Sequence, residues 1–186
     1  MKHLPVKTNK STTLNAGRRT VLRVALAQMA FAGAALAFGK TVVAGESMKK
    51  FTKSKVEWLK IITPAQYDVL FEEATERSFS SPLNEEKRKG TFVCAACNQP
   101  LFKSDTKYDS GTGWPSFFQH LPDAIGTKTD FKLLYPRTEY HCSNCGGHQG
   151  HVFGDGPAPT RKRYCNNGLA LSFIPDGQPL PAIRKS

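Results

Sequence analysis

The chain has 186 residues and a formal net charge of +11, from 26 lysines and arginines against 15 aspartates and glutamates. Seven of the basic residues and none of the acidic ones lie in residues 1–44, so the remaining 142 residues hold 19 basic and 15 acidic side chains, a net charge of +4. This small excess argues against a nucleic-acid-binding surface, and these 142 residues suit one domain with its own core and no apolar stretch long enough to cross a membrane.

Residues 1–44 have the layout of an export signal, because basic residues precede an apolar stretch at residues 24–38. Residues 17–23 resemble the twin-arginine motif, and residues 42–44 offer small side chains for cleavage. We therefore expect export to the periplasm by the twin-arginine export machinery and a mature domain that spans residues 45–186. The alternative is an uncleaved signal that anchors the protein, although this stretch is shorter than the roughly 20 residues that span a bilayer.

A helix is expected to begin at Thr63, after a basic lead-in at residues 45–60. Thr63 has the residue type of a helix cap, Pro64 suits the first helical position, and Gln66 can complete a capping box. The apolar residues that follow at helical spacing are Tyr67, Leu70, Phe71 and Ala74. This pattern predicts a helix of about ten residues with one apolar face.

From Gly90 onward the pattern changes to short strands separated by Gly, Pro and Asn. The candidate strands are Thr91–Val93, Leu101–Lys103, Phe131–Tyr135, Glu139–His141, His151–Phe153, Arg163–Tyr164 and Leu169–Ile174. Their spacing predicts a small antiparallel β fold.

Four of the five cysteines form two C-x-x-C pairs, Cys94 with Cys97 and Cys142 with Cys145. Two such pairs supply four thiolates, which most often bind one zinc ion in a tetrahedral arrangement. The two pairs are separated by 44 intervening residues, so the metal must join two distant hairpins. Two disulfides or one redox-active C-x-x-C are the alternatives, but neither pair precedes a clear helix as a thioredoxin-type motif should.

Cys165 is then the only free thiol, and the residues around it suit a nucleophile. An ordinary thiol is only a few per cent ionised near neutral pH, so a catalytic one needs a nearby cation or hydrogen-bond donor. The candidates for this work in the surrounding sequence are His148, His151, Arg163 and Asn167.

Five segments in the same order resemble the B-type methionine sulfoxide reductases, which reduce methionine-R-sulfoxide. They are residues 90–97, 110–117, 142–145, 150–153 and 163–167. The resemblance implies a mainly β fold of two small antiparallel sheets with a few N-terminal helices. It also implies one structural zinc ion per chain, remote from the catalytic thiol.

The resemblance implies that Cys165 attacks the sulfoxide sulfur and is left as a sulfenic acid when methionine departs. It assigns proton donation to His151, assisted by His148, and the aromatic pocket for the substrate methyl group to Trp114 and Phe153. We further expect a monomer that acts on oxidised proteins or peptides more than on free methionine sulfoxide.

Thr112 departs from the family, because many members have a resolving cysteine at this place. With four cysteines on zinc, Cys165 has no partner in the chain, which predicts a one-cysteine mechanism. A thioredoxin-like protein or another external thiol must then reduce the sulfenic acid. A second departure is Arg161, where many relatives have glycine. The rival functions are a non-catalytic zinc module that binds a protein or nucleic acid, and a thiol–disulfide exchanger that uses a C-x-x-C.

Overall fold

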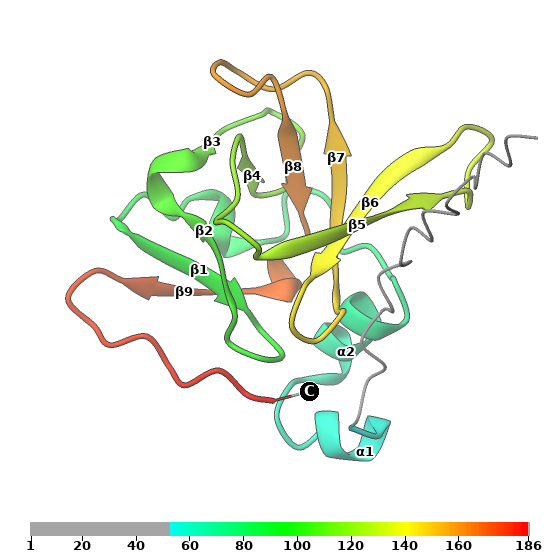
Figure 1. Cartoon of the computed structure of the whole chain (residues 1–186), viewed down its shortest axis with the longest axis vertical. Helices are drawn as coiled ribbons and strands as arrows, with labels where there is room; N and C mark the ends of the chain where they lie inside the picture. Colours follow the sequence, from blue (N-terminus) through cyan, green and yellow to red (C-terminus); the bar gives the residue numbers. More distant parts are fainter. Residues whose placement is uncertain (1–52, 186) are drawn as a thin grey trace, which may run out of the picture. The chain divides into compact units, whose positions relative to one another are not determined.

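The computed structural model describes residues 53–185, so the expected export signal at residues 1–44 lies outside the described part. The described residues form a three-stranded and a six-stranded antiparallel sheet, preceded by two short helices (Figure 1). The predicted mainly β fold with two sheets and a few N-terminal helices is confirmed. Within residues 53–185, no helix has the length and apolar character needed to cross a membrane.

Helix α2, Pro64–Phe71, begins with the predicted capping box. The Gln66 backbone N–H donates to the Thr63 hydroxyl at 3.2 Å, and the Thr63 N–H donates to the Gln66 side chain at 3.0 Å. The helix has eight residues instead of about ten, because Glu73 adopts a left-handed backbone conformation with a φ of 55°. Ala74 therefore lies outside the helix and is exposed, which corrects its assignment to the apolar face.

Helix α1, Lys55–Trp58, was not predicted and lies within the expected lead-in. It has a capping box of its own, in which Ser54 caps the backbone of Glu57 and Glu57 reaches back to Ser54. Trp58 at its end is buried in the core. Residues 53–185 also contain three short 3₁₀ turns, η1 at Pro82–Asn84, η2 at Ser104–Thr106 and η3 at Gly168–Ala170.

The smaller sheet has the strand order β2-β1-β9, with all pairs antiparallel. Its strands are β1 (Gly90–Cys94), β2 (Pro100–Lys103) and β9 (Leu171–Pro175). They coincide with three predicted strands, although β9 begins later than expected because η3 occupies its first residues.

The larger sheet has the strand order β3-β4-β8-β7-β6-β5 (Figure 1). Its strands are β3 (Lys107–Tyr108), β4 (Ser116–Phe117), β5 (Ile125–Asp130), β6 (Arg137–Cys142), β7 (His148–Phe153) and β8 (Arg163–Asn166). The predicted strand Phe131–Tyr135 is wrong, because this segment is the exposed turn between β5 and β6.

Alternation along the strands gives the larger sheet two different faces. One face packs into the core, where the ring of Phe117 stacks on Phe102 of the smaller sheet, with centroids 4.1 Å apart. Tyr140 and Tyr164 contact the same cluster edge-on. These aromatic side chains therefore join the two sheets, and the other face of the larger sheet points away from this cluster.

On that other face, directly paired residues form a row that crosses all six strands. In strand order, the row contains Tyr108, Ser116, Cys165, His151, Glu139 and Lys128. The candidate nucleophile therefore lies near the middle of the sheet, between a hydroxyl and an imidazole.

Candidate active site and metal centre

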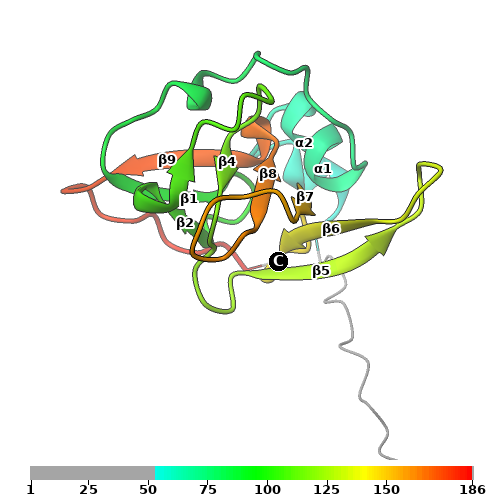
Figure 2. The ribbon, with the colours of Figure 1, turned by 90° about the horizontal axis from the view of Figure 1, so that it is seen from above.

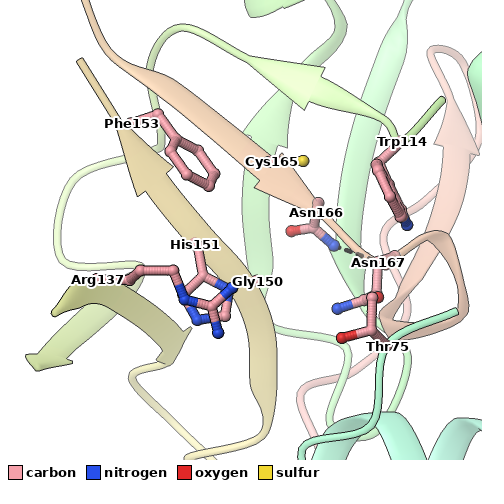
Figure 3. A pocket seen from close by; sticks show the side chains of 9 residues that line it. All are labelled: Thr75, Trp114, Arg137, Gly150, His151, Phe153, Cys165, Asn166 and Asn167. Carbon is pink, nitrogen blue, oxygen red and sulfur yellow. Dashed lines mark hydrogen bonds between the residues drawn. The ribbon is translucent and has the colours of Figure 1, made fainter. Parts of the chain in front are cut away.

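Cys165 lies on β8 and opens into a cavity of about 130 Å³ (Figure 3). It is paired with Ser116 on β4 and His151 on β7, and its side chain is partly buried. The lining residues are Thr75, Trp114, Arg137, Gly150, His151, Phe153, Cys165, Asn166 and Asn167. The cavity therefore combines a thiol, an imidazole and two aromatic rings.

Opposing effects act on the Cys165 thiol, and their sum leaves its pKa raised. Burial is the largest cause and disfavours the thiolate, whereas the charge of Arg163 and hydrogen bonds from Thr112, Arg163 and Ser116 favour it. The two hydroxyls belong to a small network, because Ser110 Oγ lies 2.8 Å from both Thr112 Oγ1 and Ser116 Oγ. This network holds hydrogen-bond donors against the sulfur.

Asp130 fixes the ring of His151 in the cavity wall. His151 Nε2 donates to Asp130 Oδ2 at 2.7 Å, and Arg137 donates to the same oxygen at 2.6 Å. A hydrogen bond from the Lys132 backbone is the largest cause that holds the pKa of Asp130 well below its usual range. Burial nevertheless lowers the pKa of His151, so the neutral ring is favoured.

His148 lies beside His151 and does not line the cavity. Its ring centroid is 5.6 Å from that of His151, and its side chain is buried. His148 Nδ1 lies 3.0 Å from Glu139 Oε1, within ion-pair distance, but the pair lacks hydrogen-bond geometry. His148 therefore contacts the ring of His151, the expected proton donor, but would not touch a molecule bound in the cavity.

Asn167 lines the cavity, but its amide group is engaged by the backbone. Its Nδ2 donates to the Gln149 carbonyl at 3.1 Å, and its Oδ1 accepts from the Glu76 N–H at 3.1 Å. The buried carboxylate of Glu76 in turn accepts hydrogen bonds from the backbone of Gly168 and Leu169, while burial raises its pKa. Glu76 thus organises the cavity floor, and it was not predicted.

Two aromatic side chains form the apolar walls of the cavity. Trp114 is held by a hydrogen bond from its Nε1 to the Glu76 carbonyl at 3.1 Å. The Arg163 guanidinium lies over the ring of Phe153, 4.2 Å from its centroid, and forms two hydrogen bonds with Asp155 at 2.8 and 2.9 Å. Arg163 therefore acts on Cys165 from outside the cavity lining.

The four remaining cysteines form a buried cluster that can hold a metal ion. Their Sγ atoms all lie within 4.8 Å of one another. Cys94 is 3.7 Å from Cys145, and Cys97 is 3.5 Å from Cys142. Four sulfurs around zinc at about 2.3 Å are roughly 3.8 Å apart, whereas a disulfide needs about 2.05 Å. The donor set and its spacing fit a tetrahedral metal ion and contain no disulfide.

Arg137 and Gly150 are two cavity residues that sequence reasoning missed. Residues 131–135, just before Arg137, were predicted as a strand. Arg137 is instead the first residue of β6, where it pairs with Asp130 at the end of β5 and lines the cavity. A Cβ atom at Gly150 would lie 1.9 Å from the Cys165 carbonyl oxygen, so only glycine permits this approach of β7 to β8. A glycine within a strand pattern was the available signal.

Comparison with known proteins identifies a domain family. The SelR domain matches residues 62–175. The peptide methionine sulfoxide reductase MsrB of Methanosarcina barkeri is 52% identical over 128 residues, which cover 68% of this chain and 90% of that protein. The MsrB of Agrobacterium fabrum is 50% identical over 127 residues, with coverages of 68% and 94%. The MsrB of Leifsonia xyli is 45% identical over 137 residues, with coverages of 73% and 99%. The chain therefore belongs to the SelR domain family of MsrB-type peptide methionine sulfoxide reductases.

Proposed function

We propose that this chain reduces methionine-R-sulfoxide in oxidised proteins or peptides to methionine, with Cys165 as the nucleophile. One observation carries the proposal: the Cys165 thiol shares a cavity with the rings of Trp114, Phe153 and His151. A methyl sulfoxide has an apolar methyl group beside a strong dipole, so aromatic walls next to hydrogen-bonding groups suit it.

In the proposed reaction, the Cys165 thiolate attacks the sulfur of the sulfoxide. The sulfur–oxygen bond of the sulfoxide then breaks as the oxygen passes to the sulfur of Cys165. The oxygen needs a proton, and the products are methionine and a cysteine sulfenic acid. His151 uses Nε2 to donate to Asp130, so its other nitrogen carries a proton only in the charged form. Protonated His151 is therefore the proton donor, with His148 assisting through ring contact.

The proposed mechanism uses one cysteine. The four other cysteines belong to the buried cluster, and Thr112 places a hydroxyl beside Cys165. The sulfenic acid is then reduced by a thioredoxin-like protein or another external thiol, which forms a mixed disulfide and regenerates the thiol after a second thiol exchange.

We infer that the cluster holds one structural zinc ion. Structural zinc contributes about 10–16 kcal/mol to folding in small domains, and here it would join the β1–β2 and β6–β7 hairpins. We also propose that the protein is a monomer exported by the twin-arginine route. Export of a folded, metallated protein would keep the cluster reduced in an oxidising compartment.

Turnover of separated R- and S-sulfoxide peptides, with dithiothreitol as the reductant, tests the proposal. We expect reduction of the R form alone by the protein and no reduction by the Cys165→Ser variant. Equal activity of that variant would remove Cys165 from the mechanism. Mass spectrometry after turnover should find no disulfide between Cys165 and another cysteine of the chain, and such a disulfide would exclude the one-cysteine mechanism.

A further inference from the structure

The turn between β5 and β6, residues 131–136, exposes an unusual concentration of apolar side chains. We call this segment the hairpin tip. Its exposed fractions are 74% for Phe131, 49% for Leu133, 107% for Leu134 and 62% for Tyr135. The hairpin extends away from the other strands in both views (Figures 1 and 2). Adjacent exposed apolar side chains of this size mark an interaction surface more often than isolated ones do.

The hairpin tip is continuous with the active-site cavity. Asp130, the last residue of β5, accepts the hydrogen bond from His151. Arg137, the first residue of β6, lines the cavity and pairs with Asp130. Both ends of the tip therefore lie at the cavity wall, so a molecule bound to the tip also borders the cavity.

A polypeptide substrate requires a binding surface outside the cavity. The methionine sulfoxide side chain enters the cavity to reach Cys165, while its backbone remains attached to the residues on either side. When the sulfoxide belongs to a polypeptide, the backbone must therefore cross the cavity rim, and the neighbouring residues must lie against the surface around it. The hairpin tip forms apolar surface next to that rim.

The charges of the hairpin favour a polypeptide over an anionic membrane as the occupant. The Lys132 ammonium pairs with the Glu73 carboxylate, and Arg137 pairs with Asp130. Within residues 131–137, both cations are thus neutralised by carboxylates of the same chain. Anionic lipid attracts clusters of unpaired Lys and Arg, and the described part of the hairpin tip offers none.

We propose that the hairpin tip binds apolar residues that flank the oxidised methionine in an unfolded polypeptide. The inference rests on the proposed function and deepens it by naming the substrate class. Most methionines are buried with apolar neighbours, and oxidation to the polar sulfoxide disrupts such cores. A damaged segment therefore presents the sulfoxide together with the side chains that suit this tip.

The test compares the full chain with the double variant Phe131→Ser/Leu134→Ser on three R-sulfoxide substrates. These are a peptide with leucines beside the sulfoxide, the same peptide with serines there, and free methionine sulfoxide. Loss of two exposed side chains leaves the fold intact. We expect kcat/KM for the leucine peptide to fall about tenfold, as for the loss of one partly buried apolar contact, and the other two values to stay unchanged.

Leu180→Ser is the matched control, because Leu180 is 48% exposed and does not line the cavity. It should leave all three values unchanged. If the double variant changed kcat/KM by the same factor for the leucine and serine peptides, or changed neither value, the inference would be overturned. Tip-dependent binding to phosphatidylserine vesicles, with kcat/KM unchanged, would also overturn it in favour of a membrane. If the unmodified chain reduced none of the substrates, the proposed function itself would fail, which is a distinguishable result.

Discussion

The side-chain amide of Gln149 donates a hydrogen bond to the sulfur of Cys94 at 3.6 Å. The amide oxygen of the same residue accepts from Asn166 Nδ2 at 3.4 Å, and Asn166 directly follows the proposed nucleophile Cys165. Gln149 is completely buried. A single side chain therefore connects the cysteine cluster with the strand that carries Cys165.

We predict that Gln149→Leu weakens both metal binding and folding. Groups that support a metal ligand typically contribute about 10- to 100-fold to affinity. The variant also leaves one N–H of the buried Asn166 amide without its acceptor, which costs about 1 kcal/mol, although Nδ2 still donates to the Asn167 carbonyl. Zinc competition with a chelator and urea unfolding measure the two effects. Gln119→Leu, at an exposed position, is the control. Unchanged zinc affinity and stability in Gln149→Leu would show that the connection is unimportant.

Thr112→Val should make Cys165 less reactive. The variant removes the hydroxyl that favours the thiolate and keeps the size of the side chain, so the pKa of Cys165 rises further. A hydrogen bond to a charged group contributes about 1.5–3 kcal/mol, which predicts a fall in kcat/KM of at least about tenfold. The pH dependence of iodoacetamide alkylation checks the cause. Thr112→Ser retains the hydroxyl and should restore the rate, and equal alkylation profiles for all three proteins would contradict the prediction.

Asp130→Asn should shift the alkaline limb of the kcat profile to lower pH. The hydrogen bond to Asp130 raises the pKa of His151 against the larger effect of burial, so its loss lowers that pKa further. Less His151 is then protonated at a given pH, and at neutral pH we expect kcat to fall about 100-fold. Asp105→Asn, at an exposed site, is the control. An unmoved limb would show that His151 is not the proton donor.

Glu73→Gln should remove an acid-sensitive part of the stability. Hydrogen bonds from Lys128 first, and from Lys132 second, lower the pKa of Glu73 from 4.5 to about 2. Because the folded-state pKa is lowered, this stabilisation is present above about pH 4.5 and is lost as the pH falls towards 2. For such a partly exposed pair it amounts to about 1 kcal/mol.

Urea unfolding at a series of pH values measures this effect. The variant should be less stable than the unmodified chain at neutral pH, and the two should converge in acid. Glu85→Gln changes a fully solvated pair with Lys87 and should alter neither stability nor its pH dependence. A constant difference between Glu73→Gln and the unmodified chain across the range would refute the assignment.

Features fixed by neighbours in sequence were predictable. The cap formed by Thr63 and Gln66 follows from local backbone geometry, and the spacing of the C-x-x-C pairs follows from metal chemistry. The resemblance does not define the turn at Arg161, and the structure gives this residue a φ of 58°, a left-handed conformation that favours glycine. Each of these features depends on a few adjacent residues.

Features that depend on distant partners were not predictable. Apolar residues at 131–135 predicted a strand, yet they form an exposed turn, because the pairing of β5 with β6 places the strand one segment earlier. Glu76 reaches the cavity only through hydrogen bonds to Asn167 and Gly168, about ninety residues away along the chain. Periodicity carries no information on such contacts.

The row of paired residues that surrounds Cys165 draws one side chain from each strand of the larger sheet, from Tyr108 at one edge to Lys128 at the other. Such an arrangement exists only after every hairpin has docked, so no proteolytic fragment can retain a reactive centre of this kind. Enzymatic turnover is for this reason a stringent reporter of complete folding, and recovery of activity on mixing two cleaved halves would measure their reassembly.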